Sequence, residues 1–410
     1  MGHSMTDAIS IDLLDPRAYG EGVPHDQLRW LRENHPVYWH DEPGGAGFWV
    51  LTSHRDVKEM EQDSETFSSE PSTALSDDSK MGDENHRHLI MSDPPHHTQH
   101  RKFLGEEFTL SHVRTMREQM ASLVDQIIDE VIEKGQCDVV ADLGRKLASH
   151  VTADLLGLDR LECMELCDAV FVTSRGASKR EGEGLTAVNT MLAHALTAWD
   201  KRFHEPRSDM LSRIAHGEVG GCPVDQLQFS IDFHVLVSAG VDTARNVVAL
   251  GLETLLEHPD QLEMLWSDEE LVPGAVEEML RWVPPILYQR RTATRDTEIG
   301  GLPIARGQKL LGFYVAANRD PEVFSDPEKF DIRRRPNPHL AFGSGRHFCL
   351  GSHLARLELN VMFRALIGRI RDIERVGPTV WQELSIAPPP LHGPVSLPIR
   401  FRPGPRVGFI

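Results

Sequence analysis

The sequence is poor in cysteine. It has five in 410 residues, at Cys137, Cys163, Cys167, Cys222 and Cys349. Their odd number and scattered positions exclude the dense disulfide framework of a small secreted protein. We therefore expect reduced thiols and a cytoplasmic protein.

Basic residues are also in deficit. The chain has 43 lysines and arginines against 62 aspartates and glutamates, which gives a formal charge of −19. Proteins that bind nucleic acid usually carry a basic excess or a basic stripe, so this balance argues against such a partner. Apolar residues make up 40% of the chain and charged residues 26%, as in a globular protein with a large core.

Targeting and membrane signals are missing as well. No apolar run reaches the length that we expect for a bilayer span, and the N-terminus lacks the pattern of a signal peptide. We therefore expect no membrane partner. Residues 1–4 precede a second methionine, Met5, and we interpret them as the remnant of an expression tag.

One of the five cysteines follows a glycine-rich stretch, AFGSGRHFCLG, at residues 341–351. Glycine permits backbone conformations that other residues resist, so this stretch can turn sharply and approach a flat ligand closely. From Leu350 onward apolar residues recur at spacings of three and four, which predicts a helix. Cys349 should then lie at a helix N-terminus, where the helix dipole lowers the pKa of a thiol and prepares it to bind a metal.

The same stretch allows a second interpretation. His347, Cys349 and His353 have a spacing that could supply three ligands to zinc. Such a site would need a fourth ligand or a water molecule, and it gives no role to Phe342 or to the glycines. A zinc site would also be colourless, which makes the two interpretations easy to separate.

A second unusual stretch covers residues 227–256, where most positions are apolar. We predict one helix about 45 Å long that is buried on nearly all sides. Gly240, Asp242 and Thr243 interrupt its apolar surface. A mid-helix glycine costs about 1 kcal/mol relative to alanine, and the threonine hydroxyl can bond to a backbone carbonyl one turn back. We expect the helix to widen locally at this point.

Together these stretches resemble the cytochrome P-450 family. Six positions fall on the family's haem-ligand signature, F-G-x-G-x-H-x-C-x-G: Phe342, Gly343, Gly345, His347, Cys349 and Gly351. Residues 239–243 match its A-G-x-D-T motif, and the resemblance covers nearly the whole chain. It implies a mainly α-helical fold with small β-sheets (α+β), a helical core that sandwiches a haem, and one catalytic domain over residues 5–410.

The resemblance assigns the contacts of the haem, which would be haem b. Cys349 is implied as the thiolate ligand of the iron. The signature positions implied around the cofactor are Phe342, Gly343, His347 and Gly351. His97 and Arg101 match a pair that grips a haem propionate, and Arg291 and His339 match further propionate positions. The histidines around His97 could otherwise bind a metal or lie in a solvated loop.

The resemblance also assigns catalytic and structural residues. The acid and the alcohol of the A-G-x-D-T motif relay protons to the reacting dioxygen, which implies this role for Asp242 and Thr243. Glu278 and Arg281 match an E-x-x-R pair that lies buried behind the haem and is joined by a later arginine.

That later arginine should be Arg334, although Arg333 and Arg335 stand only one position away. Breaking one partner of a buried ionic network can cost about 3–5 kcal/mol, so we expect the role of this group to be structural.

The implied function is that of a monooxygenase that inserts one oxygen atom of O2 into a C–H bond, by hydroxylation or epoxidation. The positions that would line the substrate pocket are Leu236, Val237, Ala239, Gly240, Pro285, Ile286, Leu287 and Ile386. This apolar lining favours a small apolar substrate such as a terpenoid, steroid, fatty acid or polyketide. The sequence does not choose among them.

Electrons are expected from a separate ferredoxin and its NAD(P)H-dependent reductase, because relatives of this length carry no reductase domain. A basic patch could dock the ferredoxin: Arg101, Lys102, Arg346, Arg356 and Arg364. A monomer is the default for the family.

Two other functions stay open at this point, a peroxide-driven haem-thiolate peroxygenase and a haem protein that binds without oxidising. Asp242 and Thr243 argue against both, because enzymes that use peroxide can dispense with a proton relay.

Overall fold

The computed structural model describes residues 11–76, 86–174, 182–384 and 387–407. Helices dominate this part of the chain. The α-helices are α1 (His25–Asn34), α2 (His54–Gln62), α3 (His96–Leu104), α4 (Leu110–Thr115), α5 (Arg117–Ile132), α6 (Arg145–Leu156), α7 (Arg160–Ser174), α8 (Glu183–His204), α9 (Met210–Ala215), α10 (Gln226–Glu257), α11 (Pro259–Ser267), α12 (Val272–Trp282), α13 (Tyr314–Ala317) and α14 (Ser352–Arg369).

The strands form small sheets. The largest has the order β1-β2-β10-β7-β3, built from Val37–His40, Phe48–Leu51, Lys309–Phe313, Tyr288–Ala293 and Phe67–Ser68. A second sheet has the order β11-β14-β4, built from Arg371–Arg375, Pro398–Arg402 and Gln136–Asp138. Two-stranded pairs are β5–β6 (Glu218–Val219 and Cys222–Pro223), β8–β9 (Thr297–Ile299 and Leu302–Ile304) and β12–β13 (Val380–Trp381 and Pro394–Ser396).

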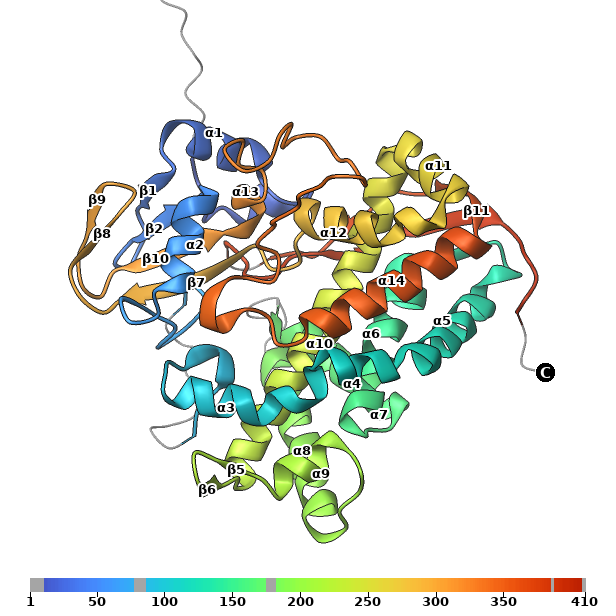
Figure 1. The fold of residues 1–410 in the computed structure, drawn as a ribbon, viewed down its shortest axis with the longest axis horizontal. Helices are drawn as coiled ribbons and strands as arrows, with labels where there is room; N and C mark the ends of the chain where they lie inside the picture. The colour runs from blue at the N-terminus through green and yellow to red at the C-terminus, as the bar shows by residue number, and fades with distance from the viewer. Residues whose placement is uncertain (1–10, 77–85, 175–181, 385–386, 408–410) are drawn as a thin grey trace, which may run out of the picture.

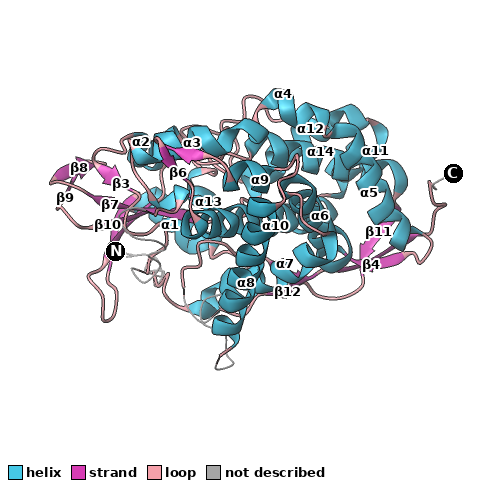
Figure 2. Ribbon diagram, turned by 90° about the horizontal axis from the view of Figure 1, so that it is seen from below, coloured by secondary structure: helices cyan, strands magenta, loops and turns pink. Residues whose placement is uncertain are grey.

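The layout separates the main sheet from most of the helices. Figure 1 shows β1, β2, β7 and β10 at one end with α2 beside them, and α5, α11, α12 and α14 toward the other. The view from below in Figure 2 shows the same separation, with α10 in the middle of the molecule. The expected mainly α-helical fold with small sheets is therefore confirmed.

The central helix α10 is the long apolar helix that the sequence predicts. It runs over 32 residues without a break, and the side chain of Asp225 caps its start by accepting from the backbone N–H of Gln228. By length and hydropathy this helix could cross a membrane, so the expectation that no run was long enough is wrong. However, 78% of its most apolar window is buried against the rest of the chain, as in the core helix of a globular protein.

Candidate active site

The stretch before α14 forms a tight loop around Cys349. The Cys349 backbone N–H donates to the carbonyl of Phe342 at 2.8 Å, which closes the loop. Gly343 and Gly345 have φ angles of +68° and +64°, in the region that favours glycine. A Cβ at Gly345 would also lie 2.4 Å from the backbone oxygen of Glu61. Both glycines that the sequence singled out are thus required by the backbone.

The start of the following helix differs from the sequence prediction. α14 begins at Ser352, three residues after Cys349; the Gly351 carbonyl accepts from the N–H of Ala355 at 2.9 Å, whereas the Cys349 carbonyl accepts from the N–H of Ser352, three residues on, at 3.4 Å. Removal from water raises the pKa of the Cys349 thiol, and the Gly351 N–H and the charges of Arg101 and Arg356 only partly oppose this. The predicted lowering of the thiol pKa by the helix is therefore wrong for the chain alone. A bound metal cation would favour the thiolate directly.

Two residues that sequence reasoning missed support this loop from the side of α2 and α13. The carboxylate of Glu61 accepts from the hydroxyl of Tyr314 and from the backbone N–H of Ser344. Arg291 Nη2 lies 3.8 Å from Glu61 Oε1. Burial raises the pKa of the Glu61 carboxyl, while Arg291 and Tyr314 oppose the shift. No pattern in the sequence distinguishes Glu61 from other acids on an amphipathic helix.

Four basic side chains gather beside the loop, and we call them the basic group: His97 and Arg101 from α3, Arg291 from β7, and His347 from the loop. The rings of His97 and His347 lie 4.0 Å apart. Burial, together with neighbouring arginines, Arg101 and Arg291 among them, lowers the pKa of His97 to about 4 and that of His347 to about 2. The two histidines are therefore neutral near pH 7, and the two arginines supply the positive charge; two guanidinium groups beside neutral imidazole N–H donors suit an anionic ligand such as a carboxylate.

His339, the fourth residue predicted to contact a propionate, has partners of its own. His339 Nε2 lies 3.1 Å from Glu277 Oε2, and its Nδ1 accepts from the N–H of Ala341 at 3.3 Å. The same glutamate receives Arg356 at 2.7 Å, and together these contacts, which outweigh the cost of burial, lower the pKa of Glu277 to about 2. Both ring nitrogens of His339 thus have partners within the chain, so its contact with a propionate stays a prediction.

The middle of α10 carries the predicted acid and alcohol. The Thr243 hydroxyl donates to the carbonyl of Ala239 at 2.8 Å, one turn back, as expected. Asp242 is buried, and its Oδ1 lies 3.3 Å from Arg245 Nη2.

The predicted widening of α10 is absent, because the helix continues unbroken from Gln226 to Glu257. Close packing explains Gly240 instead, since a Cβ there would lie 2.4 Å from Thr152 Oγ1 on α6.

The predicted pocket residues fall into two groups. Ala239 is exposed, and Gly240 and Ile286 are partly exposed. Val237 and Leu287 have 0% and 2% of their surface exposed and pack in the hydrophobic core, with Leu236 at 9%. A side chain without accessible surface cannot touch a ligand, so Val237 and Leu287 lie behind the wall of the pocket. Pro285 is buried, and Ile386 lies outside the described residues.

The E-x-x-R pair lies in α12 and is fully buried. Arg281 Nη2 lies 2.7 Å from Glu278 Oε1, with both side chains at 0% exposure. Arg334 Nε lies 3.2 Å from both carboxylate oxygens of Glu278, whereas Arg333 and Arg335 are exposed. Of the three neighbouring arginines, Arg334 joins the network.

Known proteins share this architecture. The model of the cytochrome P-450 family matches residues 15–170 and 225–371, well over half of the chain. This chain belongs to the cytochrome P-450 family. A cytochrome P-450 of Mycobacterium tuberculosis is 36% identical over 90% of this chain and 93% of its own length. A steroid C26-monooxygenase of the same organism is 33% identical and covers 98% of this chain and 100% of its own.

Other relatives agree with these. A linalool 8-monooxygenase of Pseudomonas putida is 32% identical over 88% of this chain and 93% of its own. A solved cytochrome P-450 of Mycobacterium marinum, in complex with pseudoionone, superposes with a TM-score of 0.85 at 28% identity and covers 97% of this chain and 100% of that one. This cytochrome P-450 is thus a monooxygenase, an oxidoreductase that uses O2, and its family implies a haem-thiolate cofactor.

The zinc interpretation finds no support in this cytochrome P-450. Within residues 11–76, 86–174, 182–384 and 387–407, no group of three or more His, Cys, Asp or Glu side chains is arranged to hold a metal ion. His347 Nε2 lies 3.0 Å from Ser69 Oγ, and His353 is exposed on α14.

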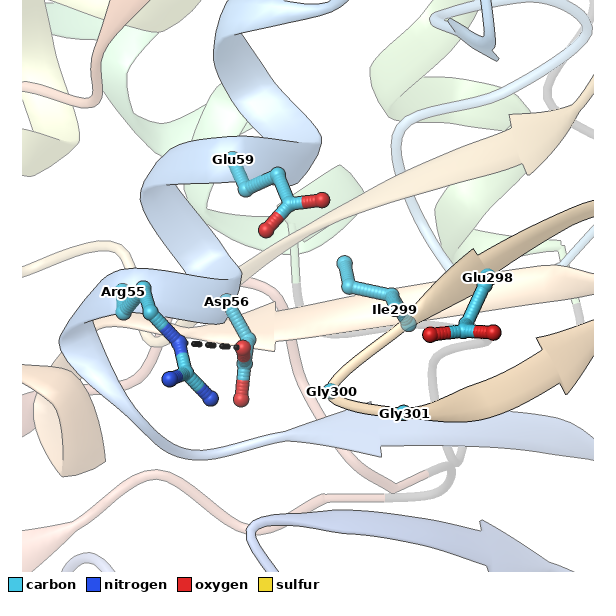
Figure 3. A pocket seen from close by; sticks show the side chains of 7 residues that line it. All are labelled: Arg55, Asp56, Glu59, Glu298, Ile299, Gly300 and Gly301. Carbon is cyan, nitrogen blue, oxygen red and sulfur yellow. Dashed lines mark hydrogen bonds and ion pairs between the residues drawn. The ribbon is translucent and has the colours of Figure 1, made fainter.

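A surface hollow of about 490 Å³ lies away from the Cys349 loop. Figure 3 shows that it is lined by Arg55, Asp56 and Glu59 of α2 and by residues 298–301 at the β8–β9 turn. Arg55 pairs with Asp56, and none of the predicted site residues lines this hollow. We assign it no part in the chemistry.

Proposed function

We propose that this cytochrome P-450 binds haem b through the thiolate of Cys349 and inserts one oxygen atom of O2 into a C–H bond of a small apolar substrate. Hydroxylation is the expected reaction, with epoxidation where the substrate offers a double bond. One observation carries the proposal, the meeting of the Cys349 loop with the basic group. A thiol beside two arginines and two neutral histidines suits both the iron and the carboxylates of an iron porphyrin.

Arg101 links the two halves of this donor set. Its charge opposes the rise in the Cys349 pKa and adds to the fall in the His97 pKa, so it lies close to both. His97 Nδ1 is buried and has no hydrogen-bond partner among the described residues. An unpartnered buried nitrogen beside a half-buried arginine fits a propionate oxygen as the missing acceptor.

When bound, the haem supplies the redox chemistry of oxygen activation, and the protein supplies protons and the shape of the site. Thr243 holds its hydroxyl proton on the carbonyl of Ala239. Rotation of this side chain would point the hydroxyl to the side of α10 on which Ala239 is exposed. When its contact with Arg245 opens, the Asp242 carboxylate could take a proton from solvent and pass it to Thr243 Oγ1. These two side chains would thus deliver protons and position water.

The substrate pocket should lie on the exposed side of α10. Ala239 and Ile286 would contact the substrate, with Gly240 and Thr243 at the floor, while Leu236, Val237 and Leu287 would form the layer behind. Such a lining suits terpenoid, steroid, fatty-acid or polyketide skeletons. The relatives named for steroid C26 and linalool C8 oxidation support the same class. Shifts of the haem spectrum across a compound library would identify the substrate.

The electrons should come from a ferredoxin and its NAD(P)H-dependent reductase. Of the five residues expected to dock the ferredoxin, Arg356 is committed to Glu277, and Arg364 lies 2.9 Å from Glu270. Lys102 and Arg346 are exposed and keep their charge available. They are therefore the better candidates for steering an acidic partner. The rate of association would then fall as the salt concentration rises.

Charge reversal tests this docking surface. Lys102→Glu and Arg346→Glu should slow reduction by the ferredoxin, with no change in the haem spectrum. Arg364→Glu is the matched control, because Glu270 already offsets that arginine. Equal reduction rates in all three variants and the wild type would place the ferredoxin elsewhere.

The ferrous carbonyl spectrum of the purified holoenzyme tests the function itself. We expect the red-shifted Soret band of a thiolate ligand, and its loss in Cys349→Ser. A band that persists in that variant would overturn the assignment of Cys349. Turnover with ferredoxin and NAD(P)H, compared with hydrogen peroxide alone, separates the monooxygenase from a peroxygenase and from a haem protein that does not oxidise.

The remaining parts of the proposal concern the state of the protein in the cell. We propose one catalytic domain over residues 5–410, a monomer in the cytoplasm. The bacterial relatives support this location. Size-exclusion chromatography with light scattering would test the monomer.

A further inference from the structure

Helix α3 carries two of the four side chains of the basic group, yet it buries little apolar surface of its own. Its buried residues are His97, His100 and Leu104, so two of the three are polar. No side chain caps its start at Pro95. A surface helix is usually fixed by an apolar stripe, and here a histidine stands between the other two buried residues. The placement of α3 therefore depends in large part on what His100 contacts.

His100 contacts the central helix through an aspartate. Its Nε2 lies 2.8 Å from Asp232 Oδ1 on α10, and both side chains have 0% of their surface exposed. Figure 1 shows α3 across the N-terminal half of α10, which contains Asp232. Gln228 Nε2 donates to the same aspartate oxygen at 3.1 Å, and Gln228 Oε1 accepts from the N–H of Arg87 at 3.0 Å. The carboxylate is thus held in place on the side of α10.

The pair of His100 and Asp232 is a costly way to join two helices. Neither ring nitrogen of His100 has a hydrogen bond of ordinary geometry within the described residues, and neither does Asp232 Oδ2. Burial raises the pKa of the Asp232 carboxyl, while His100 and Gln228 oppose the rise. Apolar side chains in place of a buried ionic pair often leave a protein as stable or more stable. Stability alone therefore gives no reason for this pair, which leaves the specific position that it imposes.

The place of His100 on α3 connects the pair with the expected haem contacts. His97 precedes His100 by three residues and Arg101 follows His97 by four, so these side chains are neighbours on the helix surface. A short helix moves as a unit, and a rotation that separates His100 from Asp232 also moves His97 and Arg101. His97 Nδ1 is the buried nitrogen for which we expect a propionate oxygen as acceptor. Misplacement of α3 would weaken this contact.

We propose that Asp232 and His100 are positioning residues, which fix α3 on α10 so that His97 and Arg101 meet a haem propionate. The inference rests on the proposed haem site, and it adds two residues that act through His97 and Arg101. An apolar pair would join the two helices without one preferred placement, because the hydrophobic effect is not directional. Loss of the pair should weaken the propionate contact and leave the Cys349 thiolate on the iron.

Replacement of the pair by Asp232→Leu together with His100→Leu tests this positioning. Leucine has the branched shape of aspartate, so we expect this double variant to fold and to keep the red-shifted Soret band of a thiolate ligand. Resonance Raman spectra of the ferric holoenzyme should show a shifted propionate bending band, because this band responds to hydrogen bonds at the propionates. Transfer of haem to an excess of apomyoglobin should be about tenfold faster, as for one weakened hydrogen bond to a charged group.

Two single variants serve as controls. Asp232→Asn keeps an oxygen that can accept from both Gln228 and His100, so the propionate band should not shift and haem transfer should stay within about twofold of the wild type. Gln99→Ala removes an exposed polar side chain of the same helix and should change neither measurement. Changes in Gln99→Ala as large as those in the double variant would overturn the inference, because any disturbance of α3 would then suffice.

Asp232→Ala provides a second test variant, which deletes only the carboxylate. An unshifted propionate band with wild-type haem transfer, in whichever of the two test variants folds, would overturn the inference. Loss of the thiolate band in both would also overturn it, since the pair would then serve the fold as a whole. A wild type that lacks the thiolate band would instead refute the proposed function, before any variant is compared.

Discussion

Arg281 offers a quantitative test of how this fold is held behind the active site. A guanidinium has five N–H donors, and all five have acceptors here. Two are the carboxylate oxygens of Glu278 at 2.8 and 2.7 Å, and three are the backbone carbonyls of Asn318, Pro327 and Lys329 at 2.9, 2.9 and 3.0 Å. The side chain joins α12 to two stretches of the chain that lie before the Cys349 loop.

Replacement of Arg281 by lysine tests this arrangement without removing the charge. An ammonium group has three donors in place of five and lacks the planar fork that fits a carboxylate. At least two of the five acceptors would lose their partner, although the charge beside Glu278 is kept. Because the site is fully buried, and each buried acceptor left unpaired costs about 1–3 kcal/mol, we expect Arg281→Lys to lower the free energy of unfolding by about 2–6 kcal/mol.

Urea unfolding of the holoenzyme, followed by tryptophan fluorescence and by the haem band, provides the assay. The control is Arg400→Ala, because Arg400 pairs with Glu374 at 2.6 Å, as short as the Arg281 contacts, but in the open. Burial, and not distance, should decide the outcome, so the control should show no measurable change. An Arg281→Lys variant no less stable than this control would refute the reasoning.

Three further predictions concern single positions. Burial raises the pKa of Glu358 from 4.5 to about 8. Between these two pH values the folded protein retains a proton that the unfolded chain loses. The free energy of unfolding should therefore fall as the pH rises from 4.5 to about 8, by at most ~5 kcal/mol. Glu358→Gln should remove this fall, as urea unfolding at about pH 5 and about pH 9 would show; an unaltered pH dependence would contradict it. Gly345→Ala should lose haem content and at least about 1 kcal/mol, because it combines a left-handed backbone with contact against Glu61; a normal ratio of haem to protein would contradict it. Gly240→Ala should destabilise the protein through its clash with Thr152, and Thr152→Ala in the same chain should restore the melting temperature; no rescue would mean that the glycine serves another purpose.

Motifs predicted the residues whose chemistry leaves no substitute. A thiol at Cys349, positive φ at Gly343 and Gly345, and a long buried α10 all follow from residue type and spacing, and the structure has each of them. The choice of Arg334 among three arginines also agrees with its contact to Glu278. In each of these cases few other residue types have the required chemistry or backbone conformation.

The sequence was less informative where several residue types could serve. Glu61 and Gln228 are ordinary polar residues on helices, and only the approach of distant segments gives them their partners. The same limit explains two wrong expectations. The Cys349 N–H closes the loop onto Phe342 before α14 begins at Ser352, and Gly240 lies against Thr152 of α6, which leaves no room for a Cβ. Neither partner can be read from the local pattern.

The case of Arg356 shows how the structure changes an experiment that the sequence alone would suggest. As one of five basic residues near the Cys349 loop, it was a natural target for charge reversal. Its guanidinium instead grips Glu277 at 2.7 and 2.9 Å and lies over the ring of Phe342, 4.4 Å from the centroid. A glutamate at this position would face Glu277 and leave the Phe342 ring uncovered, so slower reduction in that variant could report damage to the Cys349 loop as readily as lost docking. Exposed Lys102 and Arg346 avoid this ambiguity, because reversal of their charge changes the surface without breaking a contact that holds the loop.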